Sequence, residues 1–322
     1  MLLAASALGN AWQWVVHVVE RMGDLSPYLL VLALALKTCE SAFIGLVWRN
    51  ILRASYPKSG VRFRTAWGAS QGGTAINAVL PAQGGTAAMI AILRTTVPGS
   101  TVSGLTVATV VESLFFLAVS VVIVVVTAVA QPHTVSKGSP SNETGSFLAS
   151  RPWVVPVLLA AAGLVFYFLW PRLKPRLVAE WHKARRGASI FGDWGRYARD
   201  VALPSTASYC CRIGVNIVFM AAFDIPVTFY TVFLVASSHM LSQLFAITPG
   251  GVGQTQALDI ATLRHYASSR SVAAFSITQD SVITLWNVVL GIAVMLWAFG
   301  WKQMKTMLPR PHRSGARSQA ET

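Results

Sequence analysis

The sequence predicts an all-α, polytopic membrane protein: a helical bundle with about five full spans and two re-entrant helical hairpins in an inverted-topology repeat. Of its 322 residues 54% are hydrophobic and 12% are charged, whereas soluble chains carry about 25% charged residues. Lysine and arginine number 26 against 12 acids, but they cluster between long apolar stretches. Membrane lipids are therefore the expected partners, and nucleic acid is not.

Five apolar stretches are long enough to cross the membrane, which takes roughly 20 helical residues. They lie near residues 25–48, 101–130, 153–171, 204–223 and 272–300. Residues 1–24 contain two tryptophans and several interrupting polar side chains. We expect an interfacial N-terminal helix there, with a short span as the alternative. Residues 301–322 are expected to form a basic cytoplasmic tail without ordered structure.

The basic residues indicate the orientation, because lysine and arginine accumulate in cytoplasmic loops. Residues 49–64, residues 172–199 and the tail from 302 together hold 18 of the 26. The segment 131–152 holds two, so we expect it to face outside. The main domain, residues 25–300, then divides into a first repeat (25–130), a linking loop, span and basic loop (131–203), and a second repeat (204–300).

Two further segments, 65–94 and 227–267, are each interrupted by a proline–glycine cluster that begins at Pro81 or Pro249. Both ends of each segment face the same side, so the first must enter and leave from the cytoplasm and the second from outside. Irregular backbone at membrane depth is tolerated where it is buried in protein or lines a water-filled cavity. We therefore expect both breaks to line a central cavity. The alternative is that the glycines allow close helix packing or a tight turn.

The two halves of the sequence have their key residues in the same order and at similar spacing. Glu112 follows Pro81 by 31 residues, and Asp280 follows Pro249 by the same interval. Each broken segment also ends near an arginine, Arg94 in the first and Arg264 in the second. These matches support the inverted repeat.

Ionisable residues within a span are costly, so each needs a partner or a function. Glu112 and Asp280 have no partner within their own helices. Arg94 and Arg264 could pair with them or bind a lipid phosphate, and a purely structural ion pair is the alternative.

Three other ionisable residues have simpler interpretations. Lys37 and Glu40 are three residues apart on one helix face and should neutralise each other. Arg212 lies in the first turns of its span and should reach the cytoplasmic surface, with contact to a ligand as the alternative. His239 lies among serines and should be hydrogen-bonded rather than catalytic.

The candidate substrate-binding residues are those of the two breaks together with the four charged residues. They are Asn77, Pro81, Gln83, Gly84, Gly85, Arg94, Glu112, Pro249, Gly250, Gly251, Gly253, Gln256, Arg264 and Asp280. The glycines at 251 and 253 would let backbone N–H groups face a ligand, and a half-helix starting near Gln254 would direct its positive end there. No catalytic, metal-ligand or cofactor motif is recognisable, so we expect no enzyme activity, metal or cofactor.

The string Asn77-Ala-Val-Leu-Pro81-x-x-Gly84, followed by Pro249-Gly-Gly-Val-Gly253, resembles the paired motifs of the lysylphosphatidylglycerol synthetase transmembrane-domain family of flippase-like proteins. The likeness covers most of residues 25–300. It implies two re-entrant hairpins that meet in a lipid-accessible cavity, and a family activity of moving aminoacylated phosphatidylglycerol between leaflets.

Several positions depart from that family pattern. Gly85 and Ala88-Met89 stand where the family carries an acid and an arginine. Gln256 replaces a common glutamate, and Ser113 replaces an arginine that often follows the acid of the third helix. The cavity has thus lost charges that the family carries, which leaves room for a different substrate.

We interpret the sequence as a flippase or scramblase-like transporter of a polar lipid in a bacterial cell membrane. The lipid would be an anionic or aminoacylated phospholipid, or a polyprenyl phosphate lipid. One alternative is a proton- or ion-coupled transporter of a small polar solute, with Glu112 and Asp280 as proton carriers. The other is a lipid-presenting partner of a membrane synthase or glycosyltransferase. A lateral opening to lipid favours the first interpretation, and a closed vestibule favours the solute transporter.

Overall fold

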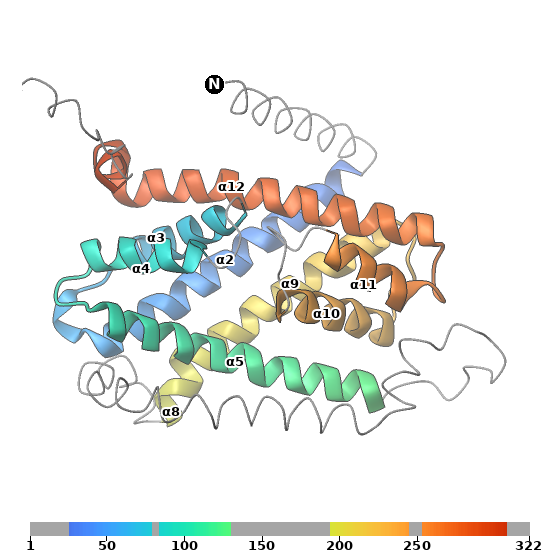
Figure 1. Ribbon diagram of the computed structural model, residues 1–322, viewed down its shortest axis with the longest axis horizontal. Coiled ribbons are helices and arrows are strands. Elements are labelled where there is room, and N and C mark those ends of the chain that lie inside the picture. Colours follow the sequence, from blue (N-terminus) through green and yellow to red (C-terminus); the bar gives the residue numbers. More distant parts are fainter. Residues whose placement is uncertain (1–25, 79–83, 130–193, 245–252, 308–322) are drawn as a thin grey trace, which may run out of the picture.

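The computed structural model describes residues 26–78, 84–129, 194–244 and 253–307, and within these ranges the chain is helical and contains no strand (Figure 1). The expected N-terminal interfacial helix, the span at 153–171, the outer loop and the end of the basic tail lie outside these ranges.

Among its described residues, the first half contains two long helices with two shorter ones between them. They are α2 (Pro27–Ser55), α3 (Phe63–Asn77), α4 (Gly84–Thr96) and α5 (Val102–Val129), with a short 3-10 turn, η1 (Pro57–Ser59), after α2. Pro27 stands at the start of α2, where its fixed φ suits a helix and its missing N–H costs no hydrogen bond. α3 ends and α4 begins on either side of the predicted break at Pro81.

The second half repeats this alternation of long and short helices. It contains α8 (Trp194–Tyr197), the π-helical turn η4 (Ala198–Ala202), α9 (Leu203–Ala222), α10 (Phe229–Leu244), α11 (Gln254–Leu263) and α12 (Ser269–Met307). α11 begins at Gln254, where the sequence predicts the start of a half-helix.

Three helices in the described ranges are long and apolar enough to cross a membrane: Pro27–Ser55, Val102–Ile123 and Ser269–Trp301. They confirm three of the five expected spans and show a multi-pass membrane protein. A helix is present where the sequence predicts a span at 204–223: it is α9, which has 20 residues. α9 is not one of the three helices that are long and apolar enough to cross a membrane.

The helices form two neighbouring groups (Figure 1). α12 and α5 run along opposite sides of the molecule, and α2 and α9 cross between them. We call α3 and α4 the first helix pair, which packs against α2 and α12, and α10 and α11 the second helix pair, which contacts α5, α9 and α12. Each pair has its own hydrophobic cluster. Entry of the pairs from opposite membrane faces and the inverted repeat stay predictions.

Small residues allow α3 to approach its neighbours closely. A methyl group at Gly68 would lie 2.6 Å from Cβ of Ala298 on α12, and one at Gly291 would lie 2.5 Å from Cβ of Ala75. α3 is therefore fixed against α12, and its other face is available to the site described next.

Candidate functional site

A cavity of about 660 Å³ lies between the first helix pair, α2 and α5, and reaches α9 and α10. Hydroxyl groups and small residues make up much of its wall. The lining includes Trp48, Ser70, Gly73, Thr74, Asn77, Gly85, Thr86, Thr109, Val110, Glu112, Leu114, Phe116, Leu117, Arg212 and Met240. Of the predicted site residues, Asn77, Gly85 and Glu112 are therefore brought together.

The side of the cavity formed by α5 is apolar and exposed. Val110, Leu114 and Leu117 line the cavity, and they are 51%, 43% and 54% exposed. All three lie on α5, whose residues Val102–Ile123 are long and apolar enough to cross a membrane. We call these three residues the apolar rim.

Glu112 and Arg212 are the charged residues of the described lining. Arg212 donates to Oε1 of Glu40 at 3.0 Å, and Lys37 donates to Oε2 of the same carboxylate at 2.9 Å. Glu40 is 1% exposed, whereas 30% of the Arg212 side chain is exposed. The predicted Lys37–Glu40 pair is confirmed.

Arg212 bonds to a carboxylate on α2, and its expected reach to the cytoplasmic surface stays a prediction. Its guanidinium group turns toward α2, where Glu40 is buried, and stacks 5.8 Å above the ring centroid of Phe116. The close packing of α2 against α9 brings the buried carboxylate of Glu40 within reach of Arg212. Arg212 thus becomes a cavity residue that the candidate set did not include.

Gly85 has a packing role that the sequence left as an alternative. Its N–H donates to Oδ1 of Asn77 at 2.7 Å, and a Cβ at this position would overlap the carbonyl oxygen of Gly73. The first helix pair can close only because position 85 has no side chain. Asn77 is at the same time a cavity residue and the acceptor that holds the start of α4.

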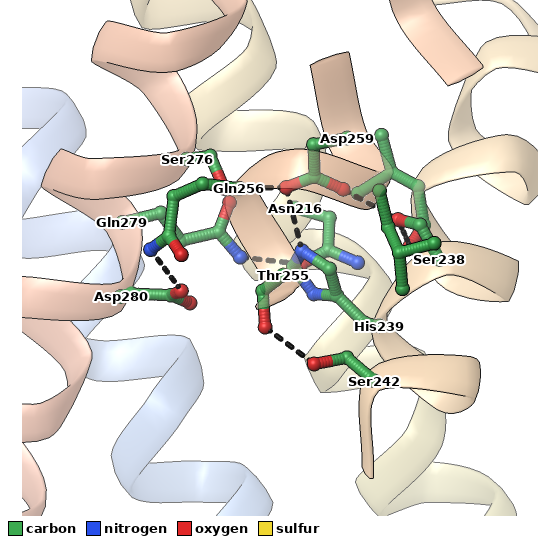
Figure 2. Close-up of polar contacts among 12 residues, drawn as sticks. Asn216, Ser238, His239, Ser242, Thr255, Gln256, Asp259, Ser276, Gln279 and Asp280 are labelled. Carbon is green, nitrogen blue, oxygen red and sulfur yellow. Dashed lines mark hydrogen bonds and ion pairs between the residues drawn. The ribbon is translucent and has the colours of Figure 1, made fainter. Parts of the chain in front are cut away.

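The second helix pair carries a network of polar contacts that joins it to α9 and α12 (Figure 2). Gln256 accepts a hydrogen bond from the N–H of Gly253 and donates to Oδ2 of Asp280 at 2.9 Å. Gly253 has φ 87°, which favours glycine, and its N–H is satisfied within the helix start. The N–H of Gly253, which the sequence analysis expects to face a ligand, is thus already bonded to Gln256. Gln256 in turn is bonded to Asp280.

Asp259 lies at the centre of this network, and the sequence analysis did not single it out. It is fully buried. It accepts hydrogen bonds from Ser238, from Ser276 at 2.6 Å and from Nε2 of His239 at 3.3 Å. The prediction that His239 is hydrogen-bonded is confirmed. The signal for Asp259 was available, since an acid in an apolar segment is the criterion that selected Glu112 and Asp280.

Two pairs of neutral side chains complete the network. Ser242 on α10 and Thr255 on α11 are 2.7 Å apart, and Gln279 on α12 donates to Oδ1 of Asn216 on α9 at 2.7 Å. All four side chains are buried. The second helix pair is therefore held by side-chain hydrogen bonds, which compensate the cost of placing polar groups away from water.

The remaining candidates are not assembled into the cavity. Arg94 lies in the last turn of α4 and Arg264 caps the end of α11, and both are exposed at positions outside the described cavity lining. Asp280 lies in the network of the second helix pair. Gly84 is the first residue of α4. Pro81, Gln83, Pro249, Gly250 and Gly251 lie outside the described residues.

A bundle of membrane-length helices around a polar cavity with an apolar rim defines an integral membrane protein of the multi-pass class. The particular family follows from sequence comparison. The chain belongs to the family described as the lysylphosphatidylglycerol synthase TM region, whose profile matches residues 2–306. The resemblance carried by the two proline–glycine motifs is thereby confirmed. Comparisons with curated proteins and with solved structures gave no match.

Proposed function

We propose that the protein moves a polar lipid between the leaflets of a bacterial cell membrane, with the headgroup in the cavity and the chains in the bilayer. The observation that carries this proposal is a cavity whose lining combines Glu112 and Arg212 with the apolar rim on α5. A headgroup needs the polar part, and its acyl or prenyl chains need the rim. Membership in a family of lysylphosphatidylglycerol synthase membrane regions supports a lipid substrate.

The charges near the cavity favour a lipid with a phosphate. Glu40 is shared by Lys37 and Arg212, so this carboxylate alone balances only one of its two cations. Arg212 keeps donors free for a second acceptor, because a guanidinium has five N–H groups. A phosphate oxygen is a strong acceptor for such a group. This chemistry fits an anionic or aminoacylated phospholipid, or a polyprenyl phosphate.

Glu112 supplies the opposite charge on the same lining. A carboxylate in this position can bind an ammonium group of an aminoacylated headgroup, or it can carry a proton. Asn77 and the wall hydroxyls can offer neutral hydrogen bonds. The apolar rim favours a lipid over a small solute, which would need a closed aqueous route. Binding and release without bond making are sufficient for this role, so we propose a transporter and not an enzyme.

Lipid movement in vesicles tests the proposal. The purified protein would be reconstituted with fluorescent phosphatidylglycerol or phosphatidylethanolamine, and an impermeant reductant would report the fraction of probe in the outer leaflet over time. We expect Glu112→Gln to slow movement at least about tenfold, equal to roughly 1.4 kcal/mol of barrier, while the melting temperature stays close to wild type.

Arg94→Gln is the matched control. It also removes one charge, but from an exposed helix end outside the cavity lining, so movement should continue at the wild-type rate. Equal rates for Glu112→Gln and wild type, or no protein-dependent movement of any phosphate-bearing lipid probe, would contradict the proposal.

A further inference from the structure

Three ionisable side chains from three helices meet beside the second helix pair. They are His239 on α10, Asp259 on α11 and Asp280 on α12 (Figure 2). Nε2 of His239 lies 3.3 Å from Oδ2 of Asp259. Asp280 is joined to α11 through Gln256, which donates to Oδ2 of Asp280 at 2.9 Å. We call these three residues the acid–histidine cluster.

The exposure of the cluster is graded. Asp259 is fully buried, 18% of the His239 side chain is exposed, and Asp280 is partly buried. Protons can therefore reach the cluster through His239 or Asp280 without opening the core around Asp259. The hydroxyls of Ser238 and Ser276 satisfy the inner carboxylate, so its charge is compensated by hydrogen bonds in addition to the imidazole.

A purely structural crosslink does not need ionisable groups at this place. Neutral pairs already join these helices: Ser242 with Thr255 between α10 and α11, and Gln279 with Asn216 between α12 and α9, at 2.7 Å each. Charged groups are costly in a membrane helix, and where they occur they mark ion or proton pathways. A histidine bonded to a carboxylate can gain or lose a proton at physiological pH.

We propose that the acid–histidine cluster is a proton-binding site and that its occupancy controls the contact between α10, α11 and α12. With both ring nitrogens protonated, His239 is a cation that donates to Asp259 and faces Asp280. When Nδ1 loses its proton to water, the neutral ring can still donate from Nε2 to Asp259. The attraction between a positive ring and the negative carboxylates is lost. Besides the members of the cluster, the charged group that faces this site from a packed helix is Arg212 on α9. Glu112 on α5 is in turn a neighbour of Arg212.

The site has a direct structural connection to the cavity. Met240, the residue after His239, is part of the cavity lining, and Arg212 belongs both to that lining and to the electrostatic surroundings of His239. A change in the packing of α10 would therefore reach the cavity wall. This consequence rests on the proposed function, whereas proton binding by the cluster does not.

The titration of His239 tests proton binding without reference to transport. In full-length protein labelled on histidine and held in lipid nanodiscs, the ring resonances would be followed by NMR against pH, and the His239→Gln variant would assign the signal. We expect the midpoint for His239 to fall by about one to three pH units in Asp259→Asn, because removing an opposite charge at this distance has an effect of that size. Asp280→Asn should shift it in the same direction by less.

Two controls separate coupling from general damage to the fold. Ser242→Ala breaks a neutral pair of the same helix pair and should leave the His239 midpoint unchanged. His265 is exposed, and its midpoint should be the same in wild type and in Asp259→Asn. A His239 midpoint that does not respond to Asp259→Asn or Asp280→Asn would overturn the proposed site.

The vesicle assay then distinguishes this inference from the proposed function. Lipid movement that varies with pH in wild type and loses that dependence in Asp259→Asn supports both. Coupled titration without any lipid movement would leave the proton site standing and overturn the lipid transporter. Lipid movement with an uncoupled His239 would retain the transporter and overturn the proton site.

Discussion

The two helix pairs differ in how their helices pack against each other. The first pair, α3 and α4, closes by removing side chains, so that the backbone at Gly73 and Gly85 meets directly. The second pair, α10 and α11, closes by adding polar side chains that bond across the interface, among them Asp259 and the Ser242–Thr255 pair. A glycine contact leaves space beside it, whereas a bonded network fills its space. Gly73 and Gly85 form part of the lining of the described cavity.

Enlarging Gly85 should have the largest effect on stability. Gly85→Val would place Cβ on the carbonyl oxygen of Gly73, and we expect a loss of about 3 kcal/mol, at the upper end for overpacking. Thermal unfolding followed by tryptophan fluorescence would measure it. Ala87→Val on the same helix is the control, since Ala87 is exposed. If the two variants melt together, the glycine contact does not hold the first pair.

The second-largest effect should be a difference in solvent access between the first and the second helix pair. In a background in which the three cysteines are replaced by alanine, a thiol at Thr74 would line the cavity, whereas a thiol at Ser242, which is 2% exposed, would be buried. We expect Thr74→Cys to react with a small water-soluble maleimide about 100-fold faster, because a buried thiol reacts only after local opening that costs about 3 kcal/mol. Comparable rates would show that the second pair is as open as the first.

Replacing an amide by a carboxylate should make the contact between α11 and α12 more sensitive to pH than it is in the wild type. Gln256→Glu removes the donor to Asp280, which is 2.9 Å away, and we expect a loss of about 2 kcal/mol at pH 8 from unpaired and repelling oxygens. At pH 5 the loss should be smaller, because one proton shared by the two carboxyls restores a hydrogen bond. Stability therefore falls as pH rises in this variant relative to wild type.

Melting temperatures at both pH values would measure that change. Gln254→Glu is the control: it adds the same charge at the first residue of α11, where the positive helix end favours it. A loss in Gln256→Glu that is independent of pH would show that the introduced carboxyl group and Asp280 do not share a proton.

The smallest effect should come from a single neutral hydrogen bond. Ser242→Ala removes the hydroxyl that lies 2.7 Å from that of Thr255, and we expect a loss of about 1 kcal/mol. Ser113→Ala should cost almost nothing, because that exposed hydroxyl bonds to a carbonyl of its own helix. Equal losses in unfolding measurements would mean that the network adds no stability to the second pair.

Much of the fold follows from local sequence properties. Long apolar stretches predicted α2, α5 and α12, and the glycine break predicted that α11 starts at Gln254. These features depend on hydrophobic length and on backbone restrictions, which a single segment of chain contains. The pair of Lys37 with Glu40 was predictable for the same reason, since the two residues share one helix face.

The site was harder to predict because its contacts join distant segments. Arg212 reaches Glu40 across 172 positions of sequence, and nothing in the spacing of either helix indicates that α2 and α9 pack together. Glu112 and Asp280 were treated as equivalent because their intervals match. The structure places the first in a cavity and the second beside Gln256. Equal spacing along the chain does not imply equal surroundings.

The buried carboxylate of Glu40 has a consequence for how the protein enters the membrane. α2 is apolar enough to insert alone, and its own Lys37 already compensates Glu40. α9 is not among the described helices that meet the length and hydropathy expected of a span, and the carboxylate that Arg212 bonds in the described part of the chain lies on α2. We therefore expect α2 to insert first during biosynthesis and α9 to enter later against it. We thus expect the two helices to assemble in the order in which they are synthesised, because α2 carries the carboxylate that Arg212 on α9 needs.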